Sequence, residues 1–258
     1  MYDRTKFSDP YAQVDIQPVH VAGKEIEKIA VRVKDDNGEQ QVVGILSKDY
    51  NLINNSIVRD VEHDIMSRSG MEWTNLKTLW DGKRYVNYYY SKNALTELKN
   101  GTTYPLHLGM MSRNAYDGSG LFAFEFFIMN MVCLNQFIAR KQMGYFAVRH
   151  IAADHFDIED AVKNVGISSN KLVEIAPKYT AMIEHKITVD DIIDAHKAEL
   201  IPDIQWGNAI DQLGKEPDSG KLFGLYQALT FVTSHKMSGM NAIKTGNNVT
   251  EHFMSLIE

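Results

Sequence analysis

Apolar residues alternate with polar ones along much of the first 150 residues, whereas beyond that point they recur every three to four residues. A period of two is the spacing of a half-buried β-strand, and a period near 3.6 is that of an amphipathic helix. A run of strands followed by a run of helices is typical of α+β proteins rather than of alternating βαβ units. We therefore predict an α+β fold, mainly an antiparallel sheet of hairpins over about 18–151 followed by a helical C-terminal part over about 156–258.

Two hairpins carry the clearest local signals. The stretch 28–34 alternates strictly, and Asp-Asp-Asn-Gly at 35–38 is a tight-turn sequence that leads into a return strand over about 40–46. The second hairpin joins 73–80 to 84–90 through Asp81-Gly82. In the first hairpin we expect Ile29, Val31 and Val33 on one side and the basic residues Lys28, Arg32 and Lys34 on the other.

The remaining elements follow from the same patterns. Apolar residues at helical spacing predict a helix over 51–68, with Leu52, Ile53, Ile57, Val61 and Ile65 on its apolar side. Three more strands are expected over 105–113, 121–130 and 143–151, with a helical turn over about 130–141. Further helices are expected over 157–185, 188–199, 205–213, 221–235 and 249–257, and Thr188 with Asp191 is an N-cap signal for the second of these.

The domain organisation that we expect has three parts. Residues 1–17 show no periodicity and are expected to form a flexible arm. Residues 18–155 are expected to form the β-rich core, and 156–258 a helical region packed on the same domain.

Composition limits the classes of protein to which this chain can belong. Hydrophobic residues make up 44% of the 258 residues, which suits a folded globular protein. The formal net charge is −6, so a nucleic-acid partner would need a local basic face. The single cysteine, Cys133, allows no internal disulfide and no thiolate metal cage, and we expect a buried thiol in a reducing compartment. No signal peptide or membrane span is recognisable, so a cytoplasmic location is expected.

Motifs for catalysis and cofactor binding are missing from the sequence. There is no P-loop, dinucleotide fingerprint, Gly-x-Ser-x-Gly elbow or His-Glu-x-x-His motif, so we predict no catalytic residue, no cofactor and no metal. His150, Asp154 and His155 have a spacing that could bind a metal, but they also fit an exposed strand-to-helix junction. Glu62, His63 and Asp64 are expected on the solvated face of their helix.

Basic and aromatic residues interleave at 24–34, at 81–90 and from Arg140 to His150. A basic groove with aromatic platforms is typical of proteins that bind single-stranded nucleic acids. The alternative is that alternate tyrosines of 85–90 belong to the core, with their hydroxyls reaching its rim. On the first interpretation the nucleic-acid-binding residues are Lys83, Arg84, Tyr88, Tyr90, Arg113, Arg140, Lys141, Arg149 and His150.

Between Ser112 and His150 the chain has Asn-Ala-Tyr-Asp-Gly-Ser at 114–119, Val-Cys-Leu-Asn at 132–135 and the pair Arg149-His150. This stretch resembles the phage/plasmid-like protein family of unknown function (DUF family 932), whose pattern is N-S-x-D-G-S, then V-C-x-N, then an R-H pair. The helix 220–235 is also similar to a helix of that family. Ala115 departs from the usual Ser, and Gln136 departs from the usual Gly.

The resemblance implies a mobile-element setting and, through a similar outline, a likeness to phage single-strand annealing proteins. The leading hypothesis is a non-enzymatic protein that binds and anneals single-stranded DNA in recombination, as a homo-oligomeric ring or filament. One alternative is an effector that binds a host or phage protein and inhibits a nuclease or defence system. Another is a small-molecule enzyme with the turn 114–120 near its site; we expect Asp117-Gly118-Ser119-Gly120 to be a hairpin turn.

Overall fold

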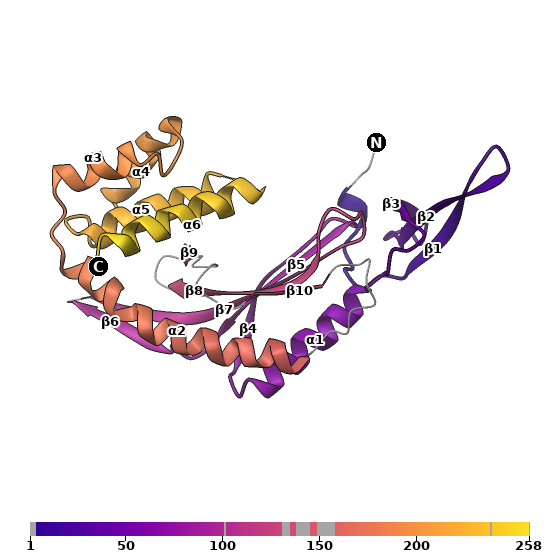
Figure 1. The fold of residues 1–258 in the computed structure, drawn as a ribbon, viewed down its shortest axis with the longest axis horizontal. Helices are drawn as coiled ribbons and strands as arrows, with labels where there is room; N and C mark the ends of the chain where they lie inside the picture. The colour runs from indigo at the N-terminus through magenta and orange to yellow at the C-terminus, as the bar shows by residue number, and fades with distance from the viewer. Residues whose placement is uncertain are drawn as a thin grey trace. The chain divides into compact units, whose positions relative to one another are not determined.

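A computed structural model of the chain describes residues 4–100, 102–130, 135–137, 145–148, 158–237 and 239–257. Within these residues the chain forms two antiparallel sheets and six α-helices (Figure 1). Strands predominate up to Val148, and five of the six described helices follow them. The predicted α+β class, with hairpins first and helices afterwards, is confirmed.

The chain divides into two compact units. Unit 1 comprises Met1–Tyr90, Met110–Glu125 and Tyr145–Val165, and unit 2 comprises Ser91–Gly109, Phe126–Gly144 and Gly166–Glu258. Each unit combines segments that lie far apart in the sequence. The expected division near residue 155 follows secondary-structure content, and as a statement about domains it stays a prediction.

The smaller sheet belongs to unit 1 and contains β1 (Val14–Val21), β2 (Lys24–Lys34) and β3 (Gln40–Ser47), in the order β1-β2-β3. The predicted β2–β3 hairpin is confirmed. The carboxylate of Asp35 accepts hydrogen bonds from the backbone N–H groups of Asn37 and Glu39, at 3.0 and 2.9 Å. Gly38 adopts a φ of 85°, which glycine reaches without steric cost.

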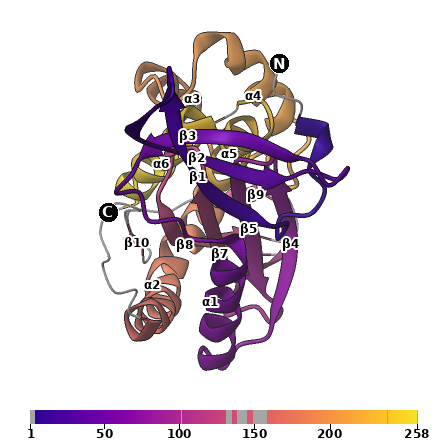
Figure 2. The same cartoon turned by 90° about the vertical axis from the view of Figure 1, so that its right-hand side faces the viewer.

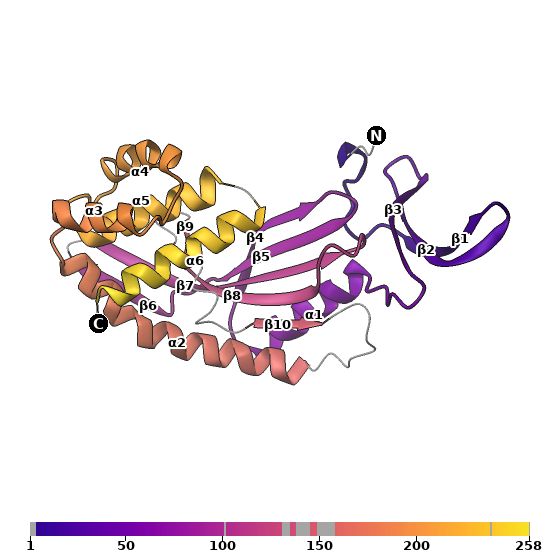
Figure 3. The same ribbon diagram turned by 45° about the horizontal axis from the view of Figure 1, so that its top comes forward.

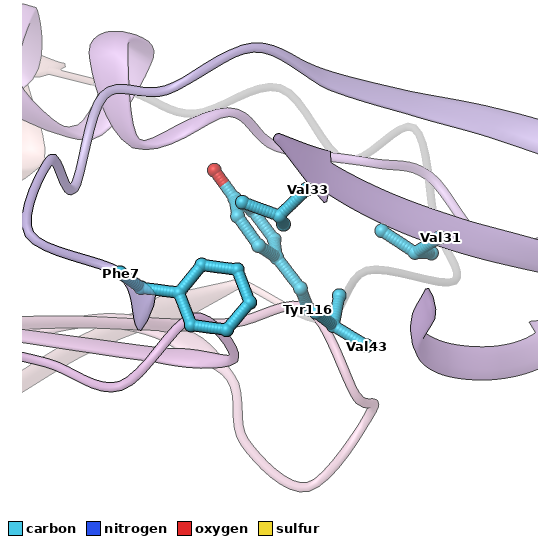
Figure 4. Packing of buried hydrophobic residues seen from close by; sticks show 5 residues of the cluster. All are labelled: Phe7, Val31, Val33, Val43 and Tyr116. Carbon is cyan, nitrogen blue, oxygen red and sulfur yellow. The ribbon is translucent and has the colours of Figure 1, made fainter. Parts of the chain in front are cut away.

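One face of this sheet forms a small hydrophobic core. Val31 and Val33 are 0% exposed and pack with Phe7, Val43 and Tyr116 (Figure 4). The expected apolar side of the β2 strand is therefore the buried one. Tyr116 lies in the turn directly after β7 (Thr102–Ala115) of the larger sheet, so this core joins the two sheets within unit 1.

The N-terminal segment differs from the flexible arm that we expected over 1–17. Residues 4–6 form a short 3-10 turn, and Val14 already begins strand β1. The Phe7 side chain is buried, and the Ser8 backbone N–H and hydroxyl donate to the Asp36 carboxylate at 2.9 and 2.8 Å. No pattern in the sequence indicates these contacts, because they are made by single side chains and follow no period.

The larger sheet has the strand order β10-β8-β7-β5-β4, with β6 paired to β7 and β9 paired to β8. Predicted strands over 73–80, 84–90, 105–113, 121–130 and 143–151 are all present, although the last is described only over 145–148. The strands are β4 (Trp73–Trp80), β5 (Arg84–Ser91), β6 (Thr96–Asn100), β7 (Thr102–Ala115), β8 (Phe122–Asn130), β9 (Asn135–Phe137) and β10 (Tyr145–Val148).

The helical turn expected over about 130–141 is wrong where the structure describes it. Residues 135–137 form strand β9, which pairs antiparallel with the end of β8. Pairing with a neighbouring strand satisfies the backbone here, and this tertiary contact overrides the local helical pattern.

Helix α1 (Asn55–Arg68) confirms the prediction over most of 51–68. Its buried side differs by one position from the expected one: Val58 is 0% exposed, whereas Ile57 is 49% exposed. The start of α2 (Ile158–Glu184) lies beside the end of α1, where Arg68 forms an ion pair with Glu159 (Figure 2).

The helices of unit 2 pack around α5 (Leu222–His235), which is buried over most of its length. It contacts α4 (Trp206–Leu213) and α6 (Gly239–Ser255), which flank it in Figure 3.

Helix α6 begins ten residues before the predicted start at 249. Helix α3 (Val189–Lys197) has the predicted cap, because the Thr188 hydroxyl accepts from the Asp191 N–H. A 3-10 turn over Asp203–Gln205 precedes α4.

Candidate nucleic-acid interface

Strand β5 carries two different faces. Tyr85, Asn87 and Tyr89 are buried and point toward helix α1, where their side chains contact Glu62. The alternate residues Val86, Tyr88 and Tyr90 are half-buried, and Arg84 is exposed. We call the face away from α1 the outer face of the sheet. The alternation therefore places Arg84, Tyr88 and Tyr90, three of the predicted binding residues, on one face of one strand.

Strand β7, next to β5, adds Arg113 to the outer face. Its neighbours Ser112 and Asn114 both hydrogen-bond to residues of α1, so Arg113 points the other way. The Arg113 guanidinium forms an ion pair with Glu125 of β8 at 3.0 Å, and only 26% of the Arg113 side chain is exposed. Its charge is therefore largely offset within the protein.

The turn that joins β7 to β8 lies beside the start of β5. The Arg84 Nε donates to the Ser119 hydroxyl at 3.1 Å, and its Nη2 lies 3.4 Å from the Asp117 carboxylate. The Arg84 side chain is still 56% exposed. Lys83 is half-buried, and its backbone carbonyl accepts from the Tyr116 N–H at 2.7 Å.

Asp117 has the role that we predicted for it, because its carboxylate accepts from the Ser119 backbone N–H at 2.9 Å and closes the turn. Burial acts to raise the pKa of Asp117, but the hydrogen bonds from Ser119 and the nearby charges of Arg84 and Lys83 outweigh it and lower the pKa below 3.8. Asp117 is therefore ionised at neutral pH and partly neutralises these cations.

Arg140, Lys141, Arg149 and His150 lie outside the described residues, as do Asp154 and His155. Their predicted roles stay predictions. Among the residues that the structure describes, no group of three or more His, Cys, Asp or Glu side chains is placed to hold a metal ion.

The opposite, inner face of the sheet holds a buried carboxyl that we expected on a solvated helix face. Glu62 of α1 is 0% exposed. Its carboxylate accepts hydrogen bonds from the hydroxyls of Tyr89 at 2.8 Å and Tyr85 at 3.2 Å, and from the Ser112 hydroxyl. The Asn87 amide donates to it at 3.3 Å. We call these five residues the Glu62 cluster.

The Glu62 cluster extends outward through further polar groups. The Asn87 side-chain oxygen accepts from Asn75 at 2.5 Å and from Thr78 at 2.8 Å, both on β4. The hydroxyl of Tyr11 lies 3.2 Å from that of Tyr85. The donors to the carboxyl come from β5 and β7, so the cluster fixes α1 on the sheet.

The environment shifts the acidity of this cluster. Burial raises the pKa of Glu62 above 4.5, and the hydrogen bonds from Ser112 and Tyr89 only partly oppose the rise. Burial and the neighbouring carboxylate also raise the pKa values of Tyr85 and Tyr89 well above 10. The sequence does contain a signal for the site, because Glu62 falls at the i+4 position from Val58 and three before Ile65, on the buried stripe of the helix.

A second polar network explains Asn114 in the turn motif. Its side-chain amide donates to the Ile53 carbonyl at 2.7 Å and to the Asn55 side chain at 2.9 Å. The Tyr116 hydroxyl accepts from the Asn55 backbone N–H at 2.8 Å. Together these residues bind the first turn of α1, so this part of the motif stabilises the fold.

The sequence from residue 42 to residue 245 matches the model of a protein family described as a domain of unknown function (DUF932). The chain belongs to this family. Comparisons with curated proteins and with solved structures give no match. The family match runs from within β3 to within α6 and includes the Glu62 cluster, the β7–β8 turn and the outer face of β5.

None of the described helices has the length and apolar character needed to cross a membrane.

Proposed function

We propose that this DUF932 protein binds single-stranded DNA on the outer face of the sheet in unit 1. The observation that carries the proposal is the alternation along β5, which puts Tyr88 and Tyr90 on the half-buried face together with the exposed Arg84. Aromatic rings on a sheet offer stacking surfaces that every base can use, and an adjacent cation can bind the backbone phosphates. Arg84 is the stronger phosphate candidate, because Glu125 offsets the charge of Arg113.

The proposed biological role is the annealing of single strands in recombination for a phage or other mobile element, in the host cytoplasm. This part rests on the resemblance of the 112–150 stretch and on the hairpins-then-helices outline. Annealing brings two strands together, so we propose that the protein acts as a homo-oligomer in a ring or filament. Size-exclusion chromatography with light scattering, with and without DNA, tests the oligomer; a monomer under both conditions would contradict it.

Fluorescence anisotropy with a labelled 30-nucleotide oligo-dT at low salt tests the binding. Tyr88→Leu should weaken binding about 5- to 150-fold, because stacking on one base contributes roughly 1–3 kcal/mol. Tyr88→Phe keeps the ring and should bind nearly as well as the wild type. Equal losses of oligo-dT affinity in both variants would argue against stacking. The absence of any binding at low salt would contradict the proposal.

Arg84→Ala tests the phosphate contact on its own. Each phosphate contact to a single strand contributes about −0.7 to the slope of log K against log salt, so this variant should flatten the slope by about 0.7. Arg68→Ala is the matched control, since Arg68 is also exposed and ion-paired but lies at the end of α1. If both variants change the slope equally, Arg84 does not contact the strand.

A further inference from the structure

The outward side of the β1–β3 sheet is the feature that the proposed function leaves unused. The register places Arg32 opposite Asp15 on one side and Val42 on the other, and Ala30 opposite Gln17 and Ile45. Residues opposite one another in an antiparallel pair point to the same face. Since Val31 and Val33 fill the small core, this row of residues lies on the other face, and we call it the basic–aliphatic face.

The aliphatic part of this face is open to solvent. Val42 is 52% exposed and Ile45 is 61% exposed. Both lie on β3, three positions apart, and a register shift leaves Val43 as an extra residue between them, so both can point outward. Two large aliphatic side chains at this level of exposure form an apolar spot where another surface can be buried.

A row of cations on β2 lies beside this apolar spot. Lys28, Arg32 and Lys34 alternate along β2 and so share the face, and the one acid that the register places there is Asp15, which pairs with Arg32 at 2.7 Å. Within the described part of the chain, no acid forms an ion pair with Lys28 or Lys34. The face is therefore locally positive on a molecule whose net charge is −6.

The mixture of groups indicates the chemistry of the occupant. Single-stranded nucleic acids are bound by cations together with aromatic rings, but the exposed apolar groups of this face are the aliphatic side chains of Val42 and Ile45. Aliphatic side chains beside a row of cations instead complement a segment that combines aliphatic and acidic residues. We propose that the basic–aliphatic face binds an acidic, amphipathic segment of another protein.

This inference does not depend on the proposed DNA binding, because it concerns the other sheet of unit 1. Arg84, Tyr88 and Tyr90 are not part of the basic–aliphatic face, and variants on each face can be measured against both ligands. The DNA-binding and peptide-binding measurements can therefore contradict one proposal while supporting the other.

Selection from a displayed library of random 16-residue peptides against the full-length protein tests the inference. The expected result is enrichment of peptides with an excess of Asp and Glu and with Leu, Ile or Val at spacings of two or of three to four. The most enriched peptide, made synthetically, should bind at least 10-fold more weakly to Val42→Ser/Ile45→Ser and to Lys28→Glu/Lys34→Glu.

The matched controls lie on α3, where Val189 is 72% exposed and Lys197 is exposed too. Val189→Ser and Lys197→Glu should leave peptide binding unchanged. No enrichment, enrichment of neutral or basic peptides, or equal losses in the control variants would overturn the proposal. Loss of oligo-dT binding in Lys28→Glu/Lys34→Glu would also overturn it and assign the lysines to nucleic acid. Circular dichroism shows whether each double variant is folded. Because the two double variants change different residues, either one that folds is sufficient to test the proposal.

Discussion

At the scale of single residues, Glu62 has the most informative environment, because it is a fully buried carboxyl held by hydroxyl and amide groups. Its pKa is raised in the folded protein, so the folded state keeps the proton at pH values where the unfolded chain has released it. The stability contributed by this group is therefore complete below pH 4.5, the ordinary pKa, and is lost as the pH rises through the raised pKa.

Glu62→Gln should remove this pH dependence. In urea unfolding from pH 4 to 8, the stability of the wild type relative to Glu62→Gln should decline as the pH rises. Glu25→Gln, a change at an exposed position on β2, is the control and should run parallel to the wild type. A constant difference between the wild type and Glu62→Gln at every pH would contradict the raised pKa.

Gly109 of β7 is required by packing in unit 2. A Cβ at this position would lie 2.2 Å from the ring of Phe127, which is buried. Gly109→Ala should destabilise the protein by about 1–3 kcal/mol, the usual cost of overpacking. Gly207→Ala in α4 is the control, since its Cβ would meet nothing within 4 Å, and it should gain up to about 1 kcal/mol. Chemical denaturation measures both, and equal effects would show that the Phe127 contact does not matter.

At the scale of elements, the β7–β8 turn connects three parts of unit 1. Asp117 closes the turn, Arg84 of β5 bonds to Ser119, and the ring of Tyr116 enters the small core under β2 and β3. Gly118 sits in the turn with a φ of 73°, and a Cβ there would lie 2.8 Å from Leu46 of β3. The turn therefore holds the two sheets together.

Gly118→Ala should cost more than Gly23→Ala, although both glycines have nearly the same positive φ, 73° and 78°. The backbone cost is about 1–2 kcal/mol in each case, and only Gly118→Ala adds the clash with Leu46. A double-mutant cycle with Leu46→Ala measures the extra cost. If the cycle shows no coupling energy between positions 118 and 46, the clash with Leu46 does not contribute to the cost of Gly118→Ala.

At the scale of the whole molecule, the acidic charge opposes the proposed DNA binding. The net charge is −6 at pH 7 and approaches zero near the pI of 5.9. Affinity for oligo-dT should therefore rise several-fold between pH 8 and pH 6.5 at constant ionic strength, because repulsion between protein and phosphates declines. Anisotropy titrations at these pH values measure the change, and an affinity independent of pH would show that local contacts alone govern binding.

The sequence by itself determined that strands come first and helices follow, and it determined the two hairpin turns and the N-cap of α3, because each depends on neighbours a few positions apart. The sequence left open whether alternate tyrosines of 85–90 belong to the core, and the structure buries Tyr85 and Tyr89. Only the tertiary structure decided which side chains donate to the Glu62 carboxyl, that Arg113 is offset by Glu125, and that 135–137 is a strand. These features depend on partners far away in the chain, and local periodicity carries no information about which distant donor, carboxylate or strand will be adjacent after folding.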